Sequence, residues 1–447
     1  MHIDKGFYRQ LFKLTLPLIF QQLLRISVNT IDSIMLGNID QIQMSAVSQA
    51  NQVFFIYYTI CCGISVGASV LVSQFWGKKD RETIRTINAH GLRTIAIFGL
   101  VFAILVHTFP ELFMRLYSSD EQMILYGSDY LKKVSLMYPL CGISVMIFTL
   151  SRGVEQVKIV LFTNIISYSV NILLDYVLIY GKFNFPAMGV DGIAIGTIVA
   201  RSVELLVCAV YFLKEIEIPF ELKDLKRVDP LIRRILFFVT LPIVAHEVVW
   251  SFGTSSGSMI LGQLGKDAVA GYNVTSVLYD LFATVGNGFS GACGIVMGMT
   301  LGKGEKEKAI AQSRRIIAIA LCMGLILGVM TLLIKDIFLG MYDLSNEAVY
   351  YARQFMNVIC LIWPFSMLEM VTMVAILRAG GDGKTGFYTD IVVMWMICIP
   401  LASYLAFKVH AKPVFIVLTI KRIIILESII GTFRVYTNKW VRVLTRS

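Results

Sequence analysis

Leu14–Asn38 reads LTLPLIFQQLLRISVNTIDSIMLGN, and a related segment recurs 225 positions later. The second copy is Val239–Gln263, VTLPIVAHEVVWSFGTSSGSMILGQ, and the two align without a gap. Each copy is apolar over about the 20 residues that a helix needs to cross a bilayer. The pair therefore predicts a membrane protein built from a repeated unit.

The composition supports this prediction. Of 447 residues, 56% are hydrophobic and 16% charged, and the mean hydropathy is +0.71, which excludes an ordinary soluble domain. Because the apolar runs are continuous and do not alternate, they favour helices over a barrel. Twelve runs of spanning length lie near residues 10–36, 46–76, 90–109, 131–151, 159–181, 190–213, 235–263, 268–301, 316–334, 355–377, 387–407 and 413–433.

The repeat keeps one register through loops, glycines and prolines. Matched pairs are Gly63 and Gly288, Gly77 and Gly302, Glu82 and Glu307, Tyr117 and Tyr342, Pro139 and Pro364, and, after one inserted residue, Arg152 and Arg378, Lys158 and Lys384. Each half contains six predicted spans. Because six is an even number, both halves enter the membrane from the same side. We therefore predict an all-α polytopic protein with two six-helix lobes, residues 1–213 and 235–447, joined by a cytoplasmic linker at 214–234 and related by a pseudo-two-fold axis along the membrane normal.

The net charge of +10 reports topology. If the N-terminus is cytoplasmic, most of the 40 Lys and Arg fall in cytoplasmic segments, so the positive-inside rule predicts that both termini are cytoplasmic. The charge then does not indicate a nucleic-acid partner. The first run is too long for a cleavable signal peptide. All eight cysteines lie in predicted spans without metal-ligand spacing, which favours apolar packing over disulfides or metal ligation.

The first span carries polar residues that are costly in hydrocarbon. At about 100° per residue, Gln21, Arg25, Asn29 and Asp32 occupy one narrow stripe of the helix. Similar polar positions follow in the second, seventh, eighth and tenth spans, at Gln49, Gln52, Glu247, Ser251, Asp280 and Glu369. Such stripes predict a wet cavity between the lobes. The alternative is that they form hydrogen bonds between helices.

Two acids in the first half indicate a cation site. Asp32 lies near mid-membrane, and Asn171 and Asp175 are four residues apart on one face of the fifth span. A buried carboxylate must be protonated, hold a cation or pair with an arginine, and each state suits coupling to protons or sodium. Thr197 and Arg201 in the sixth span are expected to complete this pocket, although Arg201 has Glu204 as an alternative partner.

The second half does not duplicate these acids. Gly257 and Leu401 occupy the positions that match Asp32 and Asp175. It carries its own polar set, His246, Glu247, Asp280 and Glu369. The two halves are therefore not expected to bind an ion identically. The sequence leaves three roles open for the second set: binding an ion, binding a substrate, or pairing only among its own members.

Several segments in this order resemble the multidrug and toxic compound extrusion (MATE) family. They are LTLPLIFQQ and DSIMLG in the first span, GISVGASVLVSQFWGKKDRE at 63–82, VNILLDYVLIYG at 170–181 and LRAGGDGK at 377–384. The resemblance implies a two-lobed antiporter in which Na⁺ or H⁺ enters while organic, often cationic, compounds leave. It needs no cofactor. It also implies a multi-pass protein of the cell membrane that acts as a monomer.

The resemblance also assigns residues. Asp32, Asn171, Asp175 and Thr197 match the coupling-cation site of the family. Pro17 matches the proline where the first helix bends, which an internal proline favours. Glu247 and Glu369 resemble acids of one branch of the family, whereas Arg25 lies outside its pattern.

Other functions remain open at this point. A flippase for lipid-linked saccharides is expected to carry several arginines in its cavity and often further helices. An intramembrane enzyme needs a nucleophile with its base or a set of metal ligands, and the sequence has neither HExxH nor a Cys/His cluster. A channel is distinguished by flux without a counter-gradient. No Walker motif supports ATP drive.

Overall fold

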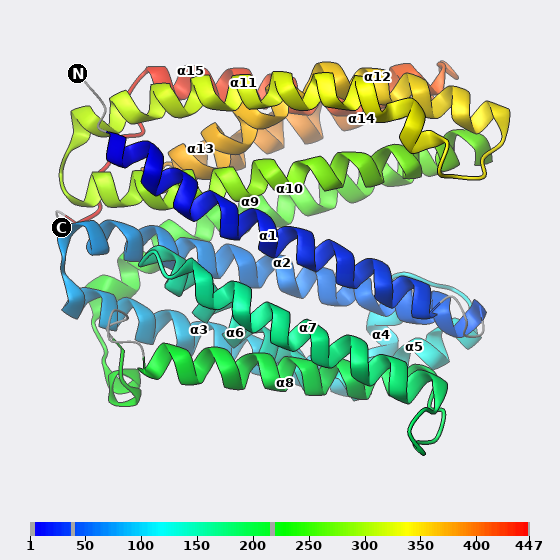
Figure 1. Ribbon diagram of the computed structural model, residues 1–447, viewed down its shortest axis with the longest axis horizontal. Helices are drawn as coiled ribbons and strands as arrows, with labels where there is room; N and C mark the ends of the chain where they lie inside the picture. Colours follow the sequence, from blue (N-terminus) through cyan, green and yellow to red (C-terminus); the bar gives the residue numbers. More distant parts are fainter. Residues whose placement is uncertain (1–4, 37–40, 215–219, 446–447) are drawn as a thin grey trace. The chain divides into compact units, whose positions relative to one another are not determined.

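Figure 1 shows the computed structural model, which describes residues 5–36, 41–214 and 220–445. Within these ranges the regular elements are helices. The contacts divide the chain into two compact units. The N-unit contains Phe20–Val72 and Asp80–Val244. The C-unit contains the chain up to Ile19, Ser73–Lys79 and the residues from Ala245 onwards.

The helices of the first half are α1 (Lys5–Leu36), α2 (Gln41–Lys78), α3 (Arg81–Thr108), α4 (Pro110–Arg115), α5 (Glu121–Val134), α6 (Met137–Gly153), α7 (Val157–Tyr180) and α8 (Val190–Lys214), with the 3₁₀ turn η1 (Leu222–Lys226) in the linker. Those of the second half are α9 (Pro230–Gly262), α10 (Lys266–Gly302), α11 (Lys306–Leu339), α12 (Asn346–Glu369), η2 (Met370–Leu377), α13 (Gly383–Thr389), η3 (Asp390–Cys398), α14 (Ile399–Phe407) and α15 (Pro413–Tyr436). η2 and η3 are π-helical.

The described helices account for the predicted spans. Ten of them are long and apolar enough to cross a membrane, and α5 with α6 forms a further pair bent by 56°. α15 has 24 residues but carries Lys421, Arg422 and Glu427. Its length still suits a span, at about 1.5 Å of rise per residue. The chain therefore has the twelve-span, two-lobed architecture.

The fourth span differs from the predicted run at 131–151. α5 begins at Glu121, where the Asp120 side chain accepts hydrogen bonds from two backbone N–H groups and caps the helix. The chain then breaks before α6, because Pro139 has no N–H to donate to the carbonyl of Ser135. Apolarity alone could not show this break, because both sides of it are apolar.

Both units draw on both halves of the sequence. α1 passes from the C-unit to the N-unit after Ile19, two residues beyond Pro17, and α9 passes from the N-unit to the C-unit after Val244, two residues beyond Pro242. The predicted lobe boundaries therefore differ from these units by the exchanged helix ends. The hinge role of Pro17 stays a prediction, and its place beside the division is what that role requires.

Equivalent glycines make equivalent contacts, as the duplication predicts. A Cβ added to Gly63 would lie 2.9 Å from Cα of Val244, within the N-unit. A Cβ added to Gly288 would lie 2.8 Å from the backbone nitrogen of Ile19, within the C-unit. Gly63 and Gly288 are 225 positions apart, and so are Ile19 and Val244. The repeat therefore extends to the close approach of individual backbones.

Another close approach of a glycine to a neighbouring backbone gives a stability prediction. A Cβ on Gly324 would lie 2.5 Å from Cα of Pro364. Because that neighbour is backbone and cannot swing away, we expect Gly324→Ala to destabilise the protein by about 1–3 kcal/mol through overpacking. Gly294→Ala is the matched control, because the nearest atom to its Cβ would be 3.8 Å away. Thermal unfolding of the purified protein in detergent measures both, and equal midpoints would contradict the packing argument.

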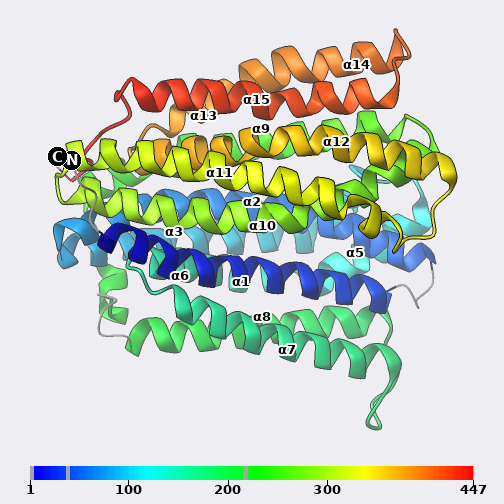
Figure 2. The ribbon, with the colours of Figure 1, turned by 45° about the horizontal axis from the view of Figure 1, so that its top comes forward.

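Within each unit, neighbouring spans form the core. α7 packs along α8, and α3 along α6, in the N-unit. In the C-unit α11 packs along α12, and α12 also contacts α10 and α15. Figure 2 shows α14 beside α15. These pairs carry the candidate functional side chains described next.

Candidate functional site

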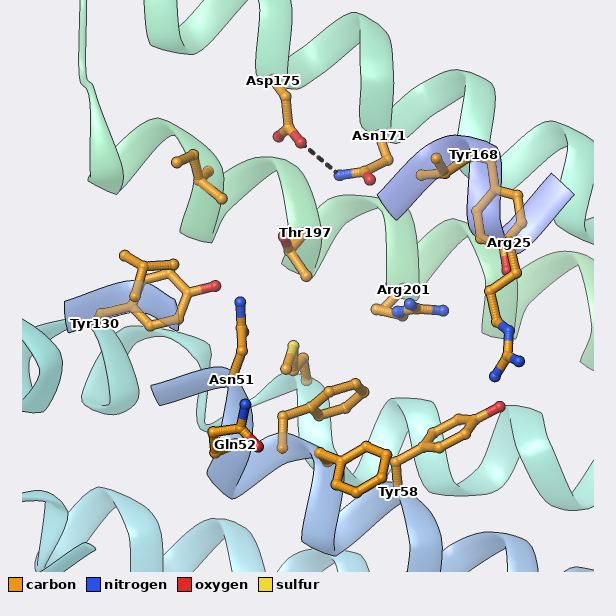
Figure 3. A pocket seen from close by; sticks show the side chains of 16 residues that line it. Arg25, Asn51, Gln52, Tyr58, Tyr130, Tyr168, Asn171, Asp175, Thr197 and Arg201 are labelled. Carbon is orange, nitrogen blue, oxygen red and sulfur yellow. Dashed lines mark hydrogen bonds between the residues drawn. The ribbon is translucent and has the colours of Figure 1, made fainter. Parts of the chain in front are cut away.

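A cavity of about 660 Å³ lies within the N-unit and is lined from α1, α2 and α5–α8. Figure 3 shows its labelled side chains. Its polar lining residues include Arg25, Asn51, Gln52, Tyr58, Tyr130, Tyr168, Asn171, Asp175, Thr197 and Arg201. Six residues named from the sequence, Arg25, Gln52, Asn171, Asp175, Thr197 and Arg201, are among them. The structure therefore brings together most of the predicted cation site with part of the predicted cavity lining.

Asp175 is held on α7 by its neighbour one turn earlier. The Asn171 amide nitrogen donates to Asp175 Oδ2 at 3.0 Å, and the two residues are 9% and 2% exposed. Gly196 of α8 lies directly beside the carboxylate, so that a Cβ there would collide with Asp175 Oδ1. Thr197 follows on the same helix and faces the cavity (Figure 3). A buried carboxylate with an amide and a hydroxyl nearby is a suitable oxygen-rich environment for a proton or a small cation.

Other predicted residues either do not line this cavity or have side chains outside the described part of the structure. The side chains of Asn29 and Asp32 are outside the described part of the structure. Gln21 is 3% exposed and bridges two elements, donating to the carbonyl of Val157 at 2.9 Å and accepting from Arg152 at 2.7 Å. It is thus a buried connection between α1, α6 and the start of α7, and does not line this cavity. Gln49 contacts the sulfur of Met123 at 3.7 Å.

The cavity also has basic residues. Arg201 forms an ion pair with Glu204 at 2.6 Å, which selects one of the two partners open from the sequence. Glu204 is 2% exposed and also accepts a hydrogen bond from Ser167. Arg25 is exposed to the cavity (Figure 3). Among the described residues no carboxylate lies within ion-pair distance of Arg25.

A second polar cluster lies within the C-unit, centred on the 4% exposed Arg378. Its guanidinium contacts Glu247 Oε1 at 2.7 Å and donates to His246 Nδ1 at 2.9 Å. Because arginine is always a donor, His246 Nδ1 must accept, and the ring proton is then on Nε2. That nitrogen faces Asp390 Oδ2 at 3.5 Å.

Further acids complete this cluster. The carboxyl groups of Asp390 and Glu427 lie within hydrogen-bonding reach of each other, and both are at least 96% buried. Glu369 interacts electrostatically with Asp390 and with Glu247. Four acids thus face one arginine and a histidine. Such a group must carry protons or bind a cation to remain buried.

The remaining predicted residues of the C-unit are separate from the core of this cluster. Asp280 is exposed and interacts with Lys421, whose ammonium lies 4.3 Å from the ring centroid of Tyr279. Ser251 is 6% exposed on α9. The structure therefore joins Glu247 and Glu369 and places Asp280 with a basic partner.

The sequence reasoning named neither Asp390 nor Glu427, and it used Arg378 only as a repeat match. The repeat contains a signal for Arg378. Arg152 contacts Gln21 on α1, and its counterpart Arg378 contacts His246 on α9, with Gln21 and His246 again 225 positions apart. Asp390 begins the π-helix η3 and Arg378 follows the π-helix η2, and such helices occur often at functional sites.

Known proteins resemble this chain over most of its length. The Probable multidrug resistance protein NorM of Photorhabdus laumondii subsp. laumondii is 24% identical over 405 residues, which cover 89% of this chain and 87% of that protein. A protein of the same name from Thermotoga maritima is 24% identical over 403 residues, covering 88% and 84%.

The fold and the family are also matched. A solved outward-facing multidrug resistance MATE family transporter of the MOP superfamily superposes with a TM-score of 0.85 at 17% identity, covering 96% of each chain. The family model described as MatE matches residues 17–177 and 242–404. This family consists of multi-pass membrane transporters and not of enzymes, which removes the intramembrane enzyme from the alternatives. The chain therefore belongs to the MatE family of membrane transporters.

Proposed function

We propose that this transporter is a multidrug antiporter that exports amphipathic organic compounds in exchange for Na⁺ or H⁺. It acts as a monomer in the cell membrane, with both termini in the cytoplasm and without a cofactor. The observation that carries the proposal is the buried Asp175 beside Asn171 at the wall of a 660 Å³ cavity. The names of the NorM relatives support the kind of compound exported.

In the proposed mechanism, one cavity binds both the coupling ion and the exported compound. A carboxylate that is 2% exposed binds a proton or a sodium ion in one conformation and releases it in another, because its solvation changes between them. An ion drives transport only to the extent that its affinity differs between the two states. The cavity is large enough for a drug-sized compound, since such sites measure about 300–1,000 Å³. Ion binding and substrate binding in the same unit are therefore coupled through its conformation.

The coupling is tested with purified protein in proteoliposomes loaded with a fluorescent amphipathic compound. We expect efflux to accelerate when an Na⁺ or a pH gradient is imposed opposite to the direction of export. Dissipating the effective gradient, with monensin for Na⁺ or nigericin for H⁺, should return the efflux rate to that of vesicles without an imposed gradient. The ion whose gradient accelerates efflux is the coupling ion.

Protein-free liposomes serve as the control for leakage. Rapid efflux in the absence of any counter-gradient would indicate a channel and contradict the proposal. Efflux that ignores both gradients would contradict it as well, because an antiporter cannot complete its cycle without the counter-ion.

A further inference from the structure

One wall of the N-unit cavity concentrates positive charge. Arg25 on α1, Tyr58 on α2 and Tyr168 on α7 all line the cavity, and both tyrosines interact electrostatically with Arg25. Arg152 on α6 is not among the residues that line the cavity, but it lies within electrostatic range of all three. Figure 3 shows Arg25 and Tyr58 together, with Asp175 and Asn171 at another part of the cavity. We call Arg25, Tyr58, Tyr168 and Arg152 the basic wall.

The charges of the basic wall have no acidic partners in the described part of the chain. The nearest polar partner of Arg152 is the neutral Gln21, at 2.7 Å. Its Nε is buried and has no hydrogen-bond partner among the described residues. Even a partly buried guanidinium without a counter-charge is costly unless an anion approaches it. Arg201 differs, because Glu204 already neutralises it.

The repeat shows that the equivalent arginines have different neighbours in the two halves. Where the C-unit has Glu247 against Arg378, the first half has Gln22. Asp390 is matched by Asn164, again a neutral residue. The last acid is not exchanged, because α8 and α15 begin 223 positions apart and Glu427 therefore corresponds to Glu204. The arginine common to both halves is thus compensated by acids in the C-unit only.

Among the residues whose side chains the structure describes, positive charge exceeds negative charge around the N-unit cavity. The described charged residues are three arginines, Arg25, Arg152 and Arg201, and two acids, Asp175 and Glu204. A proton or cation on Asp175 would increase this positive excess further. An organic cation gains nothing from such a wall, because like charges at short range repel. Arginine and tyrosine groups instead donate hydrogen bonds to carboxylates, sulfonates and phosphates.

We propose that the basic wall binds an anionic group of the exported compound, so that the substrates are organic anions or zwitterions with an apolar body. This inference rests on the proposed export function and replaces the cationic substrate expected from the sequence. Phe54 and Phe55 line the same cavity and provide the apolar contact for the body of the compound. Export of an anion in exchange for a cation moves charge in one direction, so an inside-negative membrane potential assists it.

The test compares two dyes that share a tricyclic body and differ in charge. Carboxyfluorescein is anionic and rhodamine 123 is cationic. Their binding to the full-length protein in neutral phosphatidylcholine nanodiscs is measured by fluorescence polarisation, without any gradient. We expect carboxyfluorescein to bind more tightly than rhodamine 123. Arg25→Gln should weaken carboxyfluorescein binding about 10- to 100-fold, the effect of losing a charged hydrogen bond, and leave rhodamine 123 unchanged or tighter.

Two variants control for folding and for net charge. Arg25→Lys retains the charge and should stay within a few-fold of wild type. Arg115→Gln removes an exposed arginine that pairs with Glu121 in the N-unit, and should not change the affinity for either dye. Equal or tighter binding of rhodamine 123, no binding of carboxyfluorescein, or the same affinity in Arg25→Gln as in wild type would overturn the inference.

A further arm identifies the source of the anion. If anionic lipid headgroups occupy the basic wall, nanodiscs that contain phosphatidylglycerol should weaken carboxyfluorescein binding in wild type but not in Arg25→Gln. If the wall serves soluble compounds, the lipid should have no effect. Either result supports an anion site. Failure of the export proposal is seen separately, as efflux of both dyes that ignores imposed gradients while their binding still depends on Arg25.

Discussion

Asp175→Asn is expected to abolish ion-coupled efflux while leaving the protein folded. Asparagine has nearly the shape of aspartate but cannot release a proton or neutralise a cation. Losing one charged contact weakens ion binding about 10- to 100-fold, because such contacts are worth about 1.5–3 kcal/mol. Since an ion drives only what it binds, the gradient-dependent part of efflux should fall at least tenfold. Proteoliposome efflux under the effective gradient measures this part.

Gly196→Ala provides a second way to disturb the same carboxylate. Its Cβ would collide with Asp175 Oδ1, the end of a side chain that can rotate away. We therefore expect Gly196→Ala to disturb ion binding at Asp175, with a much smaller loss of stability than a clash with backbone atoms causes. Asp191→Asn is the matched control, since Asp191 is an exposed acid at the start of α8 that pairs with Lys133. Wild-type coupling in Asp175→Asn would remove Asp175 from the ion site.

The sequence could predict the architecture because the repeat and the apolar runs depend on local chemistry. A helix must be apolar over its lipid-facing length, and a duplicated gene keeps its register. The association of Asn171 with Asp175 was predictable for the same reason, since four residues make one helical turn. Thr197 required a further assumption, that α7 packs on α8, which adjacent spans with a short connection often do.

The C-unit cluster could not be predicted in this way. A helical stripe shows which residues share a face, but not which helix that face meets. Arg378 lies 132 residues after its partner His246 of α9. In addition, η3, which begins at Asp390, winds differently from an α-helix, which shifts the angles on which a stripe is counted. Gln21 shows the converse, because it belongs to a polar stripe but is buried against Arg152.

Arg378→Met is expected to give the largest loss of stability. The variant would leave Glu247 without its ion-pair partner and His246 without its hydrogen-bond donor. Removing one member of a buried pair costs about 3–5 kcal/mol. We expect the lower end of this range, because the Glu247 side chain is 23% exposed and water can reach it. The thermal midpoint in detergent should fall accordingly.

The repeat supplies a matched control for this prediction. Arg152→Met removes the equivalent arginine, whose described partner is the neutral Gln21, so no carboxylate known from the structure loses its counter-charge. We expect a clearly smaller decrease in midpoint than for Arg378→Met. The double variant Arg378→Met, Glu247→Gln should recover part of the loss, because it removes the unpaired charge. Equal losses for Arg152→Met and Arg378→Met, without recovery in the double variant, would show that the arginines contribute packing and that Glu247 does not depend on Arg378 for its charge.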